Sequence, residues 1–83
     1  MANSTSVPER VLIKVAKCSD RLAILCRECR RASEPQEIAK AERELAISFL
    51  LEVYGMGRSK DLGVTSKEEN ALAAVAGGHG YRE

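Results

Sequence analysis

A heptad rhythm of apolar and small side chains near the start of the chain limits its fold more than any other feature. These side chains recur alternately four and three positions apart, at Val11, Val15, Cys18, Leu22, Leu25, Cys29 and Ala32. Such spacing places them on one face of an α-helix, and that face must pack against another element. We therefore predict a helix over residues 8–32. Ser19-Asp20 could break it, but the rhythm keeps its phase across that pair, so we expect one continuous helix.

A second helix is predicted from a start signal, an apolar stripe and a stop signal. The string Ser33-Glu34-Pro35-Gln36 has the spacing of a capping box, with Ser33 as the N-cap. Glycine commonly follows a helix end, so we expect the helix to stop at Gly55 or Gly57. Because one or two residues separate the first two helices, they should be antiparallel neighbours. The apolar stripe of the second helix comprises Ile38, Ala41, Leu45, Phe49, Val53 and Met56.

A short third helix is predicted after a polar connector. Residues 65–69 read Thr-Ser-Lys-Glu-Glu and contain two overlapping capping boxes, and an alanine-rich run follows over residues 71–76. Aromatic residues make up only 4% of the chain, which favours helix over sheet. The expected fold is all-α, an antiparallel helical hairpin with a short third helix. We predict one helical domain over residues 1–83, with flexible ends at 1–7 and 77–83.

The charge and hydropathy of the chain limit the kinds of partner that we expect it to bind. The formal net charge is +1, which argues against a general binder of nucleic acid or of membrane surfaces. No apolar run approaches the roughly 18 residues that a membrane span needs. The first residues, MANSTSVPER, lack the basic start and apolar stretch of a signal peptide. We therefore predict a cytoplasmic protein with no membrane partner.

Three cysteines and one histidine are the side chains best suited to reaction or metal binding. Cys26 and Cys29 have the spacing of a redox pair, but they fall near the expected end of a helix, where the dipole raises a thiol pKa. With Cys18 they lie on the heptad face, so we expect three buried, reduced and metal-free thiols. Metal ligation, redox chemistry and an intermolecular disulfide remain alternatives. A zinc site would need a fourth ligand, and His79 in the glycine-rich tail is the only histidine.

Catalytic groups are not recognisable in the sequence. His79 has no nucleophile or carboxylate at a motif-like spacing, and flanking glycines would hold a base poorly. The strings Gly55-Met56-Gly57 and Gly77-Gly78-His79-Gly80 do not continue as the Lys-Ser/Thr of a phosphate loop. We therefore predict no enzyme, no cofactor and no metal.

One segment resembles a DNA-binding element. Leu62-Gly63-Val64-Thr65 is similar to the turn of helix-turn-helix proteins, a resemblance that covers residues 59–78. It implies two short helices, the second of which enters the DNA major groove. A plain connector followed by a helix cap explains the same residues. A basic cluster could contact phosphates, although its position at a helix end also complements the helix dipole; it comprises Arg27, Arg30 and Arg31.

Apolar surface remains after the predicted helices are paired. It lies at the end of the hairpin where the first helix begins and the second ends, and it comprises Leu12, Ile13, Ile47, Leu51 and Tyr54. Excess apolar surface often marks an interface, although the third helix and the connector could bury it within one chain. We predict a non-enzymatic protein-interaction module, an adaptor, regulator or inhibitor, that docks this surface on a partner protein and forms a homodimer. A DNA-binding regulator that uses residues 59–78 is the alternative.

Overall fold

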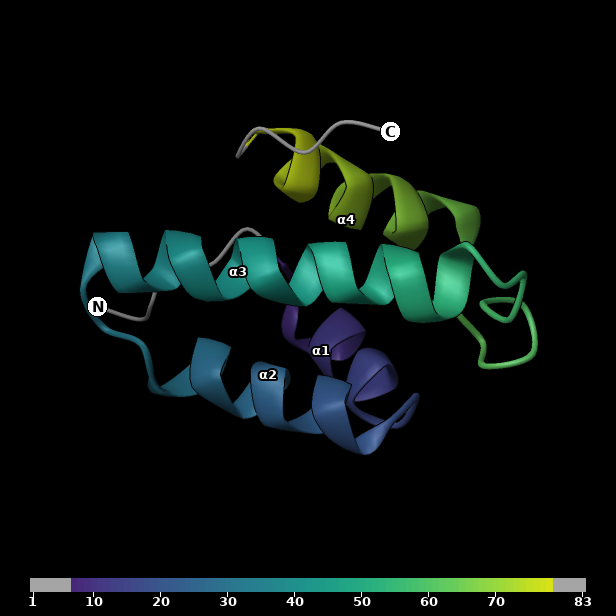
Figure 1. Cartoon of the computed structure of the whole chain (residues 1–83), viewed down its shortest axis with the longest axis horizontal. Coiled ribbons are helices and arrows are strands. Elements are labelled where there is room, and N and C mark those ends of the chain that lie inside the picture. The colour runs from purple at the N-terminus through teal and green to yellow at the C-terminus, as the bar shows by residue number, and fades with distance from the viewer. Residues whose placement is uncertain (1–6, 79–83) are drawn as a thin grey trace.

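Helices account for all the regular secondary structure in the part of the chain that the structure, a computed structural model, describes, residues 7–78. The elements are α1 (Glu9–Ala16), α2 (Asp20–Arg31), α3 (Pro35–Phe49), the π-helical turn η1 (Leu50–Tyr54) and α4 (Ser66–Gly78). In Figure 1, α3 runs through the middle of the molecule, with α4 on one side and α2 and α1 on the other. The prediction of an all-α fold is confirmed. Within residues 7–78 no helix is long and apolar enough to cross a membrane.

The predicted continuous first helix is wrong, because the chain forms two helices there. α1 ends at Ala16, and Ser19 is extended, with φ −163° and ψ 163°. The Ser19 hydroxyl accepts a hydrogen bond from the Leu22 N–H at 3.1 Å, which makes Ser19 the N-cap of α2. The same hydroxyl donates to Glu52 Oε1 at 3.0 Å, so η1 holds the break in place. The three helices expected from the sequence therefore become four among the described residues.

The residues of the heptad rhythm remain largely buried despite this break. The side chains of Val11, Val15, Leu22 and Cys29 are all essentially inaccessible to solvent, and Cys18 and Ala32 are also buried. Leu25 is half-buried against the same core. α1 packs on α2, and α2 packs on α3, so the face points inward from two helices instead of one. The apolar rhythm therefore predicted burial correctly, although it did not predict the turn.

α3 begins one residue later than the predicted capping box requires. Glu34, not Ser33, is its N-cap, with φ −77° and ψ 140°, and no side chain caps the helix there. Pro35 is the reason, since proline favours the first helical position and forces the preceding residue into extended backbone. Residues 32–34 thus link α2 to α3, which lie side by side in Figure 1.

The end of the long helix confirms the predicted glycine stop. In η1 the Gly55 N–H donates to the Leu50 carbonyl at 2.7 Å, a π-helical bond that spans five residues. The Arg58 N–H then donates to Val53 O at 2.9 Å and the Gly57 N–H donates to Tyr54 O at 3.0 Å. This pair of bonds is a Schellman closure, and it needs the left-handed backbone that Gly57 adopts at φ 70°.

α4 begins with the predicted capping box. Thr65 Oγ1 accepts a hydrogen bond from the Glu68 N–H at 3.2 Å, and Glu68 Oε1 accepts one from the Thr65 N–H at 2.9 Å. The helix packs on α3 and η1. It continues through Gly77 and Gly78, which the sequence assigned to a flexible end. At the other end of the chain Val7 is buried, and residues 1–6 and 79–83 lie outside the described part.

Candidate functional site

The five residues predicted to form an interface do not lie on one surface. Leu12 is only 3% exposed and belongs to the core, and its carbonyl accepts a hydrogen bond from Cys26 Sγ at 3.3 Å. Its assignment to the surface is therefore wrong, because the separate helix α1 turns Leu12 toward α2. Ile13, also on α1, is exposed. Ile47, on α3, is half-buried, whereas Leu51 and Tyr54 in η1 are 64% and 54% exposed.

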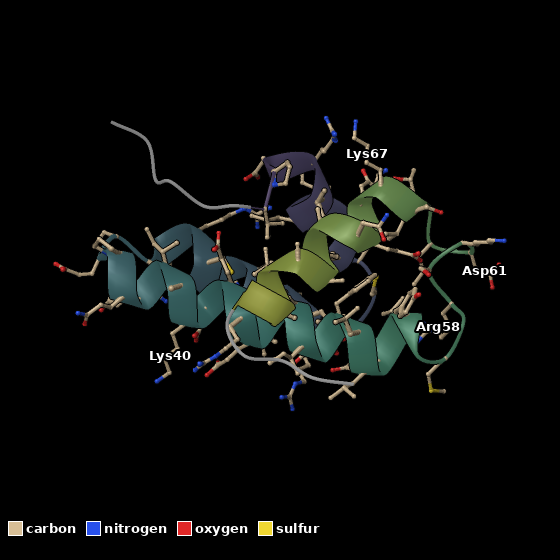
Figure 2. The ribbon with its side chains drawn as sticks, turned by 90° about the horizontal axis from the view of Figure 1, so that it is seen from above. Lys40, Arg58, Asp61 and Lys67 are labelled. Carbon is tan, nitrogen blue, oxygen red and sulfur yellow. The ribbon has the colours of Figure 1, made fainter. Side chains whose placement is uncertain are left out.

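Three of the five predicted residues share the outward stripe of α3 and η1. Lys40 and Glu44 are exposed on the first half of this stripe, and Ile47, Leu51 and Tyr54 continue it at spacings of three and four residues. Figure 2 shows Lys40 pointing away from α4 and α1, on the side of α3 that no other helix covers. The stripe is therefore charged in its first half and apolar in its second.

Met56 follows Tyr54 by two residues and is exposed, although the sequence placed it in the core stripe. Its side chain is 69% exposed, the highest value among the large apolar residues of the described chain. The Schellman closure at Gly57 turns the chain away directly after Met56, so the core stripe ends at Val53. We define the interaction face as Ile47, Leu51, Tyr54 and Met56.

A rigid support lies beneath the interaction face. Leu50 and Val53, which alternate with its members, are buried in the core, as is Phe49. On the α2 side, Glu52 accepts the Ser19 hydroxyl at 3.0 Å and lies 3.6 Å from Arg21 Nε. These contacts fix the backbone of η1. A partner that binds the apolar side chains above it would therefore not have to order this segment first, which lowers the entropic cost of binding.

The π-helical turn sets the positions of Leu51 and Tyr54. A π-turn holds more residues than an α-turn, so it turns Tyr54 somewhat away from the α-helical stripe, while Leu51 and Tyr54 both remain exposed. Such turns are rare and frequently occur at functional sites. Gly55 closes this one, and a Cβ at that position would lie 3.0 Å from the Leu50 carbonyl oxygen. A side chain at position 55 would therefore require the Leu50 carbonyl to move by a few tenths of an ångström.

The basic cluster proposed for nucleic acid is surrounded by carboxylates. Arg27, Arg30 and Arg31 are all exposed on α2. Arg30 Nη2 lies 3.0 Å from Glu9 Oε2, which ties α2 to α1. Arg31 lines an open cleft of about 460 Å³ between α2 and α3, together with Glu28, Ala32, Glu37, Lys40, Ala41 and Glu44. Three glutamates in that lining offset the positive potential that phosphate binding requires.

The segment that resembles a helix-turn-helix contains one helix instead of two. Residues 59–64 form a hydrogen-bonded turn, in which the Val64 N–H donates to Ser59 O at 3.0 Å and Gly63 has φ 78°. Only α4 follows. Its first turn packs against α1, where Lys14 Nζ donates to both carboxylate oxygens of the buried Glu68 at 3.1 Å. The resemblance would make α4 the recognition helix, but its first turn makes contacts within the chain, with Lys14 of α1.

Glu68 connects α4 to α1 through two cations. Besides Lys14, Arg10 Nε lies 3.6 Å from Glu68 Oε2. The pKa of the Glu68 carboxyl is held below its ordinary value of 4.5, chiefly by the hydrogen bonds from the Thr65 backbone and from Lys14. The carboxylate therefore stays charged at neutral pH. It takes part in the capping box of α4 and also in the contacts with Lys14 and Arg10 of α1, which we call the clasp.

The three cysteines are buried, as predicted. Burial raises the pKa of Cys26 to about 11 and that of Cys29 to about 12, and it also raises the pKa of Cys18. Such thiols are poor nucleophiles at neutral pH. Over residues 7–78 the cysteines form no disulfide, and no group of three or more Cys, His, Asp or Glu side chains is arranged to hold a metal ion. His79 lies outside the described residues.

Comparison with protein families, with curated proteins and with solved structures gives no match for this chain. Its function is therefore inferred from the interaction face.

Proposed function

We propose that this chain is a non-enzymatic protein-interaction module, an adaptor, regulator or inhibitor, that docks the interaction face on a protein partner. One observation carries the proposal. Leu51, Tyr54 and Met56 lie within six residues of one another at the end of one helix, and each is more than half exposed. Single exposed apolar residues are ordinary on protein surfaces, but a contiguous group is not.

The residue types of the face support a protein partner. Tyrosine and methionine are enriched at protein interfaces, where they supply large apolar area with adaptable packing. Tyr54 adds a hydroxyl that can remain hydrogen-bonded at the rim. The support beneath the face, from Phe49 and from the Glu52 contacts, keeps these side chains ordered before a partner arrives.

DNA binding through residues 59–78 and the basic cluster is the second proposal, and Arg27 and Arg31 on the exposed side of α2 are what favours it. A mobility shift on duplex DNA at two salt concentrations separates it from the first. Binding driven by phosphates weakens steeply with ionic strength. Retention of duplex DNA at physiological salt that is lost in an Arg27→Ala, Arg31→Ala double variant would replace the first proposal by the second.

The docking proposal is tested with two aspartate variants. Leu51→Asp places a charge in the interaction face, and Ile24→Asp makes the same change at a residue of similar type that is 49% exposed on α2. Both variants should stay helical by circular dichroism, because neither side chain is in the core. Affinity purification from the native host, followed by mass spectrometry, should recover the same protein with wild type and Ile24→Asp but not with Leu51→Asp. Equal recovery by all three would contradict the proposal.

A further inference from the structure

We draw no further inference here: the strongest candidate, the exposed apolar surface patch on the outer side of α3 and η1, already serves the proposed function, and nothing in the structure shows what covers it.

Discussion

One long helix carries two apolar faces, and only one of them is covered. The inner face of α3 and η1 is fully buried in the core and comprises Leu45, Phe49 and Val53. The outer face is half-buried to exposed and comprises Ile47, Leu51, Tyr54 and Met56. Both α2 and α4 pack on α3, yet no described helix covers its outer side (Figure 2). The number of elements available for packing, not the apolar content of a helix, decides which face becomes core.

The largest expected effect in this comparison lies on the inner face. Phe49→Ala removes a fully buried ring and leaves a cavity, which should lower the free energy of unfolding by about 3–5 kcal/mol. Chemical denaturation followed by circular dichroism measures it. A loss below about 1 kcal/mol would mean that the inner face is not the core.

A smaller effect is expected at the clasp between α4 and α1. The pKa of Glu68 is lowered in the folded chain, so its contribution to stability is present above the ordinary value of 4.5 and is lost as the pH falls through the folded pKa. Glu68→Gln should remove this part of the acid dependence and lower stability at neutral pH. Denaturation of both proteins between pH 2 and pH 7 tests it. Parallel pH profiles for wild type and Glu68→Gln would contradict the clasp.

The cap at the break between α1 and α2 should matter less than the buried ring. Ser19→Ala removes the hydrogen bond to the Leu22 N–H and the bond to Glu52. Loss of a serine N-cap costs about 1 kcal/mol. Ser19→Asp is the matched variant: it keeps a capping oxygen but places a second carboxylate beside Glu52. It should therefore recover only part of the loss. Full recovery with Ser19→Asp would show that the contact to Glu52 contributes nothing.

The smallest effect on stability is expected on the outer face. Leu51→Ala shortens a side chain that is 64% exposed, so the free energy of unfolding at low protein concentration should change by less than about 0.5 kcal/mol. The contrast with Phe49→Ala, two residues away, sharpens the distinction between core and interface. A loss above 2 kcal/mol would place Leu51 in the core.

The sequence predicted what is periodic and missed what depends on single contacts across the fold. The heptad rhythm identified the buried face of α1 and α2, and the glycine and capping signals located the end at Gly57 and the start at Thr65. Besides its local cap to Leu22, Ser19 is held by Glu52, which is 33 residues away, and a local pattern carries no information about that second contact. The pair Ser19-Asp20 did favour a break, but our prediction gave more weight to the uninterrupted spacing of the apolar residues.

The candidate surface was predictable in part for the same reason. Ile47, Leu51 and Tyr54 were found because they lie opposite the core stripe on one helix. Leu12 was misplaced because the break turns α1 toward α2, and Met56 because the closure at Gly57 ends the core stripe before it. Both errors follow from the assumption that a helix continues where a turn intervenes.

Thermal unfolding of Leu51→Asp tests most directly the claim that the outer face is an interface and not core. A charge placed in the core would unfold the chain, whereas a charge on an exposed face leaves the folded monomer intact. Leu51 and Ile24 are both exposed, so we predict that Leu51→Asp and its control Ile24→Asp melt within a few degrees of wild type. A Leu51→Asp variant that melts well below wild type would show that the face is part of the core and would contradict the account.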